Sequence, residues 1–385
     1  MAISIERGGK EASAVPSIKV LVLGPRGIVD VQGGIEMHCR KLYPLLARLD
    51  CAVEVIQRTP YYRRPRRETW HGVALTYLWS PRGSGLETAV HSLLGVLYAA
   101  LKRPDILHLH AVGPALLAPL ARLLGLRVVV THHAADYRRE KWGAFAKLLL
   151  KTGERFGMRF AHHPIVVSEV LRESVRSEYG VQASLIPNGV PRFARARTTG
   201  TLEALGLVAG RYVMCVARLD KVKRQLDLVE AFERARMPGW KLVLVGAIDE
   251  RNAYAQRIVR RCAANPLIVL AGFQQGRPLG ELFSYCGLFV LPSSLEGHPI
   301  AVLEALAYGA RVLVSDLPET RALPLSDDCY FPVGDIDKLA SLLAAAAADE
   351  CRPQNLRDVI REKYSWRRAA QLTRSVYRQV LDGDL

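Results

Sequence analysis

The chain has 385 residues, half of them hydrophobic, and a formal net charge of +16 at pH 7. This length favours two domains, and the hydrophobic content is ample for two packed cores. The longest apolar runs, such as Leu93–Leu101, are shorter than the roughly 20 residues of a membrane-spanning helix, which argues against an integral membrane protein.

The N-terminal segment and the cysteines predict the compartment. Residues 1–17 are polar and lack the apolar core of a signal peptide, so we expect a flexible tail there. The seven cysteines show no metal-type spacing, and several lie in apolar segments, as reduced core thiols do. These features predict a cytoplasmic protein.

Positive charge is concentrated in the first half of the chain. Residues 1–195 carry 28 Lys and Arg against 15 Asp and Glu, whereas the remainder carries 25 against 22. A basic half implies an anionic partner, namely nucleic acid, acidic lipid or a phosphorylated substrate. Charge alone does not choose among these three.

The first predicted elements are a strand, a glycine-rich loop and a helix. Ile18–Leu23 is an apolar strand, Gly24–Gly34 forms the loop, and Ile35–Leu49 has apolar residues at helical spacing. This layout presents backbone amide groups to a phosphate. The loop lacks the G-x-G-x-x-G order, so it gives no support to a nicotinamide cofactor.

Two basic stretches of the first half also carry aromatic residues. Arg58–His71 suits single-stranded nucleic acid, a membrane interface or simply a solvated loop. Trp142–Phe160 is predicted to be an amphipathic helix, interrupted near Gly153 and Gly157, with its aromatic residues on one stripe. Its cations recur at every fourth residue: Lys147, Lys151, Arg155 and Arg159. Both stretches favour an anionic membrane surface, and the alternative is core packing with solvated cations.

Histidines lie at the ends of two predicted strands. His108 and His110 share one face of a strand, as metal ligands would, but the lack of a nearby third ligand favours packing or a place beside a site. His133 and Asp136 follow the strand Arg127–Thr131 at its carboxyl end, the edge at which parallel sheets bind ligands.

The second half begins after a predicted linker, Pro191–Gly200, with the strand Tyr212–Ala217. Arg218 ends this strand, and Lys223 lies five residues later. Two fixed cations beside a helix start suit a diphosphate leaving group. A solvated basic turn is the alternative, since other cations are adjacent.

The most informative segment is Phe289–Asp316, which is predicted to form a strand, a loop, a helix and a second strand. Glu296 lies in the loop, and Glu304 lies within the helix among apolar residues, where a carboxylate needs a partner. Pro299 suits the first turn of the helix and Gly309 suits its end. Amide groups at this helix start favour an anion or a polyhydroxyl ligand.

This segment resembles the donor-site signature of retaining GT-B glycosyltransferases of family 4, including bacterial polysaccharide and lipopolysaccharide enzymes. The family pattern is P-S-x-x-E-G-x-x-x-x-x-x-E-A-x-A-x-G. The matching residues are Pro292, Ser293, Glu296, Gly297, Glu304, Ala305, Ala307 and Gly309. The resemblance extends from about Ile18 to Trp366, nearly the whole chain.

Two shorter motifs resemble the family with one departure each. Arg218 and Lys223 match R-L-x-x-x-K-G, but Arg224 replaces the glycine. His133 and Asp136 match His-Gly-x-Asp, but Ala134 replaces the glycine, which leaves the conformation of that loop open.

The resemblance implies an α/β fold of the GT-B type, in which two Rossmann-like domains with parallel sheets face an interdomain cleft. The alternation of predicted strands and helices independently indicates parallel α/β sheets. An acceptor-side domain would occupy residues 18–190 and a linker residues 191–200. A nucleotide-sugar-binding domain would occupy residues 201–365, and a terminal helix, 366–385, would pack back toward the first domain.

The implied activity is transfer of a hexosyl or deoxyhexosyl group from a nucleoside-diphosphate sugar, with retention of configuration. The acceptor would be a glycan or a lipid-linked glycan of a cell-surface polysaccharide, reached from the cytoplasm or from the inner face of the membrane. Neither a metal nor a cofactor is expected, because the sequence shows no acidic metal-binding triad.

The resemblance also assigns roles to residues. Arg218 and Lys223 would stabilise the leaving diphosphate, Glu304 would hold the ribose, and Glu296 would hold the sugar and phosphate. His133 would orient the donor sugar, with Asp136 on the acceptor side. The catalytic set would be His133, Arg218, Lys223 and Glu296. Further donor contacts would come from Gly33, Gly34, Phe273, Gly297, His298, Pro299 and Ile300.

Three other functions compete with this interpretation. A sugar-nucleotide epimerase shares the architecture, but its additional acid and base residues are not identifiable. A nucleic-acid-binding protein explains the charge but not the two glutamates and the Arg/Lys pair. A non-catalytic nucleotide-sugar-binding protein is not separated from an enzyme by sequence.

Overall fold

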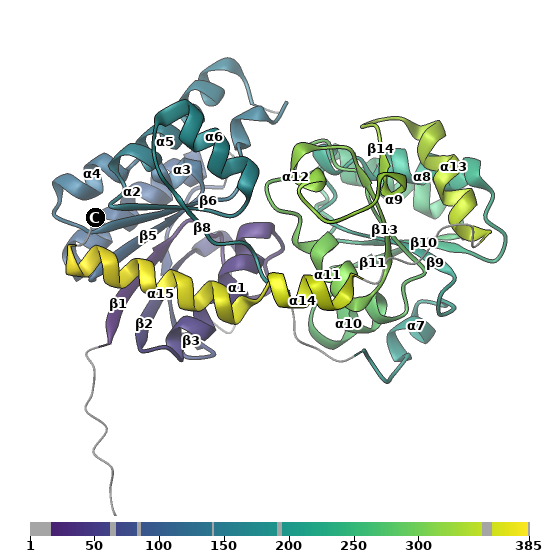
Figure 1. Ribbon diagram of the computed structural model, residues 1–385, viewed down its shortest axis with the longest axis horizontal. Helices are drawn as coiled ribbons and strands as arrows, with labels where there is room; N and C mark the ends of the chain where they lie inside the picture. The colour runs from purple at the N-terminus through teal and green to yellow at the C-terminus, as the bar shows by residue number, and fades with distance from the viewer. Residues whose placement is uncertain are drawn as a thin grey trace, which may run out of the picture.

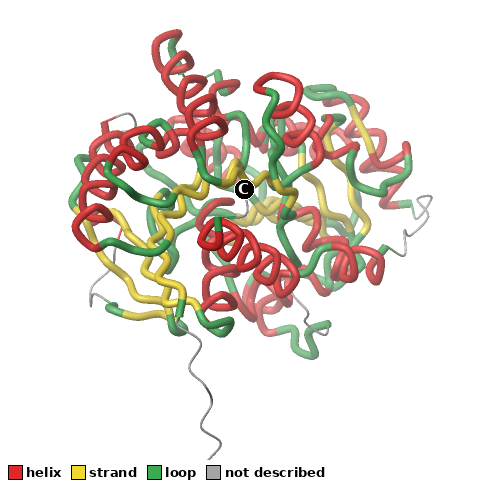
Figure 2. Tube along the Cα trace, turned by 60° about the vertical axis from the view of Figure 1, so that its left-hand side comes forward, coloured by secondary structure: helices red, strands yellow, loops and turns green. Residues whose placement is uncertain are grey.

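The protein is described as a computed structural model, which covers residues 17–61, 67–82, 86–140, 142–190, 195–348 and 356–383. Most of the predicted tail, and the central part of the basic aromatic stretch at residues 62–66, lie outside these described residues. Two open sheets dominate the structure (Figure 1), and in each the strands lie inside and the helices outside (Figure 2).

The first sheet has eight strands in the order β3-β4-β2-β1-β5-β6-β7-β8. Only the short pair β3–β4 is antiparallel; the other pairings are parallel. The strands are β1 Ile18–Leu23, β2 Cys51–Arg58, β3 Thr69–Trp70, β4 Val73–Leu78, β5 Ile106–His110, β6 Val128–His132, β7 His163–Val166 and β8 Ser184–Leu185. The helices are α1 Gly34–Ala47, α2 Leu86–Lys102, α3 Val112–Ala115, α4 Ala118–Leu123, α5 Ala144–Phe160 and α6 Glu169–Tyr179.

The second sheet has six parallel strands in the order β11-β10-β9-β12-β13-β14. They are β9 Tyr212–Val216, β10 Lys241–Val245, β11 Ile268–Gly272, β12 Leu288–Leu291, β13 Arg311–Ser315 and β14 Tyr330–Phe331. The helices are α7 Gly200–Ala204, α8 Gln225–Ala235, α9 Ala253–Ala263, α10 Gly276–Ser284, α11 Ile300–Tyr308, α12 Pro318–Arg321, α13 Ile336–Ala347, α14 Arg357–Lys363 and α15 Trp366–Asp382. Short 3-10 turns lie at Thr59–Tyr61, Asp136–Arg138, Lys221–Lys223 and Asp327–Cys329. The predicted two-domain α/β architecture is confirmed.

Four hydrophobic clusters fill the faces of the two sheets, as β-branched and leucine-rich parallel strands require. On the first sheet, one face is covered by α1 and α15, and the opposite face by α2, α4, α5 and α6. The last helix therefore packs on the first sheet, although it follows the second sheet in the chain (Figure 1).

The chain passes between the two sheets twice, and the two passages lie side by side. Val190 forms a parallel bridge with Ser365, and its amide donates to the carbonyl of Tyr364 at 3.0 Å. A side chain on Gly189 would overlap the backbone of Trp366. Glycine at this position therefore permits the close approach of the two connections.

The helix α5 is continuous, whereas its sequence predicts an interruption near Gly153 and Gly157. These two glycines face α3, where a Cβ on Gly157 would lie 2.7 Å from the Cβ of Ala115. The buried residues of α5 are Gly153, Glu154, Gly157 and Met158, so the aromatic stripe does not form the buried face, as core packing of that stripe would require. Phe145 on that stripe is 78% exposed.

The helix before β12 is α10, which begins at Gly276 and ends at Ser284. Pro278 lies in its first turn, where a missing backbone N–H costs no helical hydrogen bond. Proline therefore marks the start of this helix rather than a break before it.

Candidate active site

A cleft of about 550 Å³ lies between the two sheets, where their strands end. This is the edge at which open parallel sheets bind ligands. Every residue predicted for the site lines this one cleft: Gly33, Gly34, His133, Asp136, Arg218, Lys223, Phe273, Glu296, Gly297, His298, Pro299, Ile300 and Glu304.

The glycine loop before α1 is held by an ion pair that sequence did not predict. Arg26 Nε donates to Glu36 Oε1 at 2.9 Å, and Arg26 also donates to the carbonyl of Gln32 at 2.6 Å. A Cβ on Gly33 would overlap the Glu36 carboxylate, whereas nothing lies within 4 Å of one on Gly34. A larger residue at position 33 would thus displace the Glu36 carboxylate from its pair with Arg26, and Gly34 leaves open space beside the start of α1.

Positive charge converges on the centre of the cleft. Burial lowers the pKa of Arg218, and the neighbouring cations Arg26 and Arg139 lower it further. The Arg218 guanidinium has an ion-pair partner in Asp220, but at 3.8 Å this contact is long. A bound anion would relieve the repulsion among these three guanidinium groups.

The second predicted cation is paired with a predicted carboxylate. Lys223 Nζ donates to Glu296 Oε1 at 2.6 Å, with only 19% and 8% of the two side chains exposed. Lys223 belongs to a 3-10 turn that begins after Asp220, whose side chain accepts from the amide of Val222 at 3.2 Å. Arg224, in the place of the family's glycine, has a positive φ of 49°. Its guanidinium pairs with Asp227, which holds this conformation.

The loop between β12 and α11 touches the first domain directly. A Cβ on Gly297 would overlap the carbonyl oxygen of His133 and lie 2.9 Å from the Cβ of Ala134. Ala134 itself has no positive φ, so this position does not require glycine. The substitution at Ala134 is compatible with the loop, and Gly297 is the glycine that the contact between domains requires.

Glu304 is buried in the second turn of α11 and lines the cleft. Burial raises the pKa of Glu304 to about 7, an effect that the charge of Lys41 partly offsets. Among the described residues, no group donates a hydrogen bond to its carboxylate. Pro299 precedes the first residue of α11 instead of lying within its first turn, and Gly309 caps the helix with a φ of 83°.

The loop of the second domain that carries Phe273 and Gln275 is in contact with α1. The Arg40 guanidinium lies 6.0 Å from the centre of the Phe273 ring and donates to Gln275 Oε1 at 2.9 Å. Gln275 in turn donates to Asp30 at 2.6 Å. These contacts between domains fix one end of the cleft.

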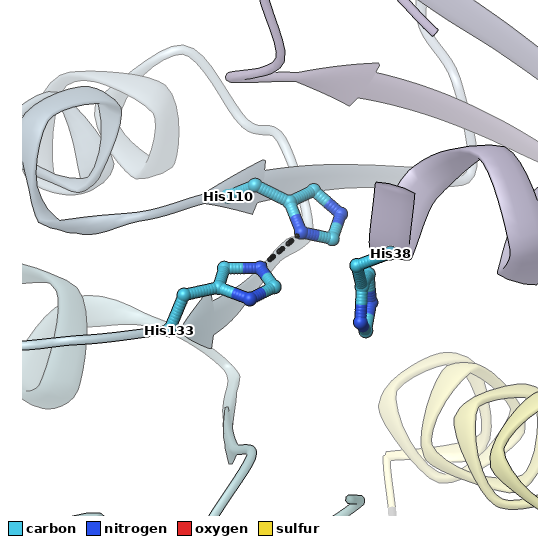
Figure 3. Close-up of side chains that lie close together, drawn as sticks. All are labelled: His38, His110 and His133. Carbon is cyan, nitrogen blue, oxygen red and sulfur yellow. Dashed lines mark hydrogen bonds between the residues drawn. The ribbon is translucent and has the colours of Figure 1, made fainter. Parts of the chain in front are cut away.

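His133 belongs to a buried cluster with His38 and His110 (Figure 3), whose ring nitrogens lie within 4.8 Å of one another. His110 Nδ1 and His133 Nε2 share a hydrogen bond of 2.9 Å, and the Tyr43 hydroxyl is hydrogen-bonded to His110 Nε2. His38 Nδ1 is bonded to Asn188 at 2.7 Å. Sequence grouped His108 with His110 but missed this cluster, because α1 supplies His38.

The histidines of this region are neutral near pH 7. Burial lowers the pKa of His38 to about 4 and that of His133 well below its ordinary value. The pKa of His108 falls to about 3 for the same reason. His108 Nε2 is hydrogen-bonded to the Thr131 hydroxyl at 2.7 Å, and His108 Nδ1 to the Tyr377 hydroxyl at 2.6 Å. His108 is therefore a packed residue of the core.

The first domain forms the wall of the cleft that carries Asp136, the residue predicted to lie on the acceptor side. Asp136 pairs with Arg139 at 2.9 Å. A buried pair, Arg58 and Glu87 at 2.7 Å, extends this wall, and Tyr61 donates to Glu87 at 3.1 Å. Sequence identified Asp136 but not this second pair, whose members lie far apart in the chain.

Comparison with known proteins agrees with this geometry. The model of Glycosyltransferase Family 4 matches residues 32–192, and that of Glycosyl transferases group 1 matches residues 207–364. The chain is 29% identical over 272 residues to the UDP-Gal:alpha-D-GlcNAc-diphosphoundecaprenol alpha-1,3-galactosyltransferase of Escherichia coli, covering 66% of this chain and 70% of that protein.

Two further likenesses span almost the whole chain. The alpha-maltose-1-phosphate synthase of Mycobacterium tuberculosis is 26% identical, covering 91% of this chain and 96% of that protein. The sucrose-phosphate synthase of Thermosynechococcus elongatus has a similar fold, with a TM-score of 0.81 at 20% identity, covering 95% of this chain and 100% of that one. The chain is a glycosyltransferase and belongs to the GT-B glycosyltransferases of family 4.

Proposed function

We propose that this enzyme transfers a sugar from a nucleoside-diphosphate sugar to a glycan or lipid-linked acceptor of a cell-surface polysaccharide, with retention of the anomeric configuration. The observation that carries the proposal is the convergence of Arg218, Lys223 and the open start of α1 at Gly34 in one cleft between the domains.

The first chemical requirement is stabilisation of the departing diphosphate. Arg218 and Lys223 supply cations, and the amides at Gly33 and Gly34 supply dipoles aimed at the place where charge develops. The repulsion among Arg218, Arg26 and Arg139 supports this assignment, because a diphosphate would remove it. Glu296 holds Lys223 in position until the donor arrives.

The second requirement is a firm hold on the nucleotide. Glu304 faces the cleft and accepts hydrogen bonds from the ribose hydroxyls, which gives its buried carboxylate the partners it otherwise lacks. Phe273 lies beside the base. Glu296 and the amides from Gly297 to Ile300 bind the sugar and phosphate at the start of α11.

The third requirement is an arrangement for same-face substitution. A phosphate oxygen of the donor takes the acceptor proton, the C1–O bond to the diphosphate breaks, and the acceptor oxygen bonds to C1 on that face. Burial keeps His133 neutral and weakly basic, which supports a role in orienting the donor sugar rather than in removing a proton. Asp136 lies on the acceptor side.

We propose that neither a metal nor a cofactor takes part, since the cations of the cleft suffice for the leaving group. Within the part of the chain that the structure describes, the cluster of His38, His110 and His133 is the group whose spacing resembles a metal site. Both ring nitrogens of His110 are engaged by Tyr43 and His133, so ligation would break one of these hydrogen bonds. We do not propose nucleic acid as a partner, because binding of nucleic acid would explain neither the two glutamates nor the cleft.

We place the enzyme in the cytoplasm, peripheral to the inner face of the membrane. Among the described residues, none of the helices combines the length and hydrophobicity needed to cross a bilayer. The described cysteines are free thiols, in keeping with a reducing compartment. The basic charge of the first domain supports an anionic surface as its partner.

A panel of sugar nucleotides labelled in the sugar tests the proposal. Transfer to an acceptor, or slow hydrolysis that releases the nucleoside diphosphate, is the expected result. Formation of an epimeric sugar nucleotide would instead indicate an epimerase, and binding without turnover of any donor would indicate a non-catalytic protein. A thermal-shift screen with nucleoside diphosphates selects the base first, because a ligand at 100 times its Kd stabilises by roughly 2.7 kcal/mol.

A further inference from the structure

The helix α2 has its apolar face on the outside. The residues that it buries against the first sheet are small, polar or charged, with one valine: Glu87, His91, Ser92, Gly95, Val96 and Ala99. Its large exposed apolar side chains are all leucines: Leu86, Leu93, Leu94, Leu97 and Leu101. An amphipathic surface helix of a soluble domain has the opposite orientation.

The neighbouring helices continue this apolar surface. The helix α4 contacts both α2 and α5. All three helices lie on the side of the first sheet that faces away from α15 (Figure 1). Leu123 at the end of α4 is 85% exposed, and Phe145 and Leu148 of α5 are 78% and 65% exposed. We call the exposed side of α2, α4 and α5 the outer face. Exposed apolar patches of this extent mark contact with another phase or partner.

The charges of the outer face have one sign. On these three helices the acidic residues are buried in pairs: Glu87 with Arg58, and Glu154 with His132. The exposed charged residues are all basic: Lys102, Arg122, Lys147, Arg155 and Arg159. Among the described residues, none of these five has an ion-pair partner. A row of leucines flanked by unpaired cations fits the boundary of an anionic bilayer, in which apolar side chains enter the lipid and cations meet headgroups.

We infer that the outer face docks on the surface of an anionic bilayer. A second copy of the chain would also cover the leucines. However, a symmetric dimer places the same patch of each copy against the other, so that cations would face cations. Charge complementarity therefore favours the lipid surface.

This docking would also orient the active site. Thr88 and Ala89 in the first turn of α2, and Ala146, Leu149 and Leu150 in α5, line the cleft. The outer face and the acceptor-side wall of the cleft thus share two helices. This step rests on the proposed function: a lipid-linked acceptor held in the same bilayer would reach the cleft between α2 and α5 without leaving the membrane.

Vesicle co-sedimentation of the full chain tests the inference. We compare phosphatidylcholine vesicles with vesicles that also contain phosphatidylglycerol, at low and high salt. Binding is expected only to the anionic vesicles and is expected to weaken as salt rises. The triple variants L93Q/L97Q/L101Q and K147Q/R155Q/R159Q should each lower apparent affinity at least tenfold. None of these six residues lines the cleft, so turnover of a water-soluble acceptor should be unchanged.

Matched controls come from the second domain. Exposed apolar residues are replaced in V208Q/V359Q, and exposed cations of α9 are replaced in R257Q/R260Q. Both variants should bind vesicles as the parent protein does. Equal binding to neutral and anionic vesicles would overturn the inference. So would light scattering that shows a dimer dissociated by the leucine variant, without vesicle binding. Vesicle binding without any glycosyl transfer would leave the docking intact and refute the proposed function instead.

Discussion

Lys223 Nζ lies 2.6 Å from Glu296 Oε1, so that a proposed leaving-group cation is held by a proposed donor-binding carboxylate. Both side chains are mostly buried, and they come from elements 73 residues apart in the chain. The pair orients Lys223 toward the cleft before a donor binds, which reduces the reorganisation needed when negative charge develops.

Lys223→Ala should lower turnover by about 10²–10³-fold, with a smaller effect on nucleotide affinity, because the cation acts mainly in the transition state. Initial rates and calorimetric binding of the nucleoside diphosphate measure the two effects. Lys221→Ala is the control, since Lys221 is an exposed cation that pairs with Glu140. Near-native turnover of Lys223→Ala would remove Lys223 from the mechanism.

Glu304→Gln should have opposite effects on binding and on stability. Loss of charged hydrogen bonds to the ribose should weaken nucleotide binding by about 1–3 kcal/mol. In the free enzyme the pKa of Glu304 is raised from 4.5 to about 7. The contribution of Glu304 to the free energy of unfolding is therefore complete below pH 4.5 and decreases as pH rises toward 7. The glutamine avoids this loss, so the variant should be more stable at pH 8, by on the order of 3 kcal/mol at most.

Urea unfolding at pH 5 and pH 8 separates these effects. Glu319→Gln is a matched control, because burial also raises the pKa of Glu319 and that residue does not line the main cleft. Glu319→Gln should also raise the free energy of unfolding at pH 8, but it should leave nucleotide affinity unchanged. Unchanged nucleotide affinity of Glu304→Gln would refute the role of Glu304.

The buried histidines should make the fold sensitive to acid. For His108 the pKa is lowered from 6.5 to about 3, so its contribution to stability is present above pH 6.5 and is lost as pH falls toward 3. His108→Gln should reduce the slope of unfolding free energy against pH by up to one proton, about 1.4 kcal/mol per pH unit. Chemical denaturation across this range measures the slope. An unchanged slope in His108→Gln would contradict the assignment.

Gly297→Ala should disturb the contact between domains without unfolding either one. The new Cβ would overlap the His133 carbonyl oxygen, so the cleft should open and kcat/KM should fall at least tenfold, as expected for displaced catalytic groups. Small-angle scattering should show a larger radius of gyration. Gly200→Ala introduces a Cβ with nothing within 4 Å and should resemble the parent protein. An unchanged radius and activity in Gly297→Ala would show that the domains do not depend on this approach.

Much of the fold follows from local patterns. The strand Ile18–Leu23 has the predicted boundaries, and Phe289–Asp316 contains the predicted strand, helix and second strand, because buried parallel strands are short apolar runs between turn residues. The helix α2 was not predicted, since its leucines suggest a buried segment and its polar residues face inward.

For the site, too, the motifs predict which residues lie in the cleft, whereas their partners are known only from the structure. The motif residues lie in one cleft, as spacing and resemblance suggest. The pair of Arg26 with Glu36, ten residues apart, had no signal in the sequence. Neither had the partners from distant segments: Arg40 with Gln275, and His38 with His110 and His133. Which cations are paired, and which glycine permits domain contact, depends on tertiary packing.

The most direct test of the central claim is the anomeric configuration of the first product, determined by ¹H NMR during transfer from an α-linked sugar nucleotide. The configuration of a glycosidic product is fixed once the bond has formed, so it reports the stereochemistry of transfer directly. We expect an α-linked product from the parent enzyme, formed at a rate that Lys223→Ala reduces by about 10²–10³-fold. A β-linked first product, or transfer that proceeds at the parent rate without Lys223, would contradict retaining transfer assisted by the cations of this cleft.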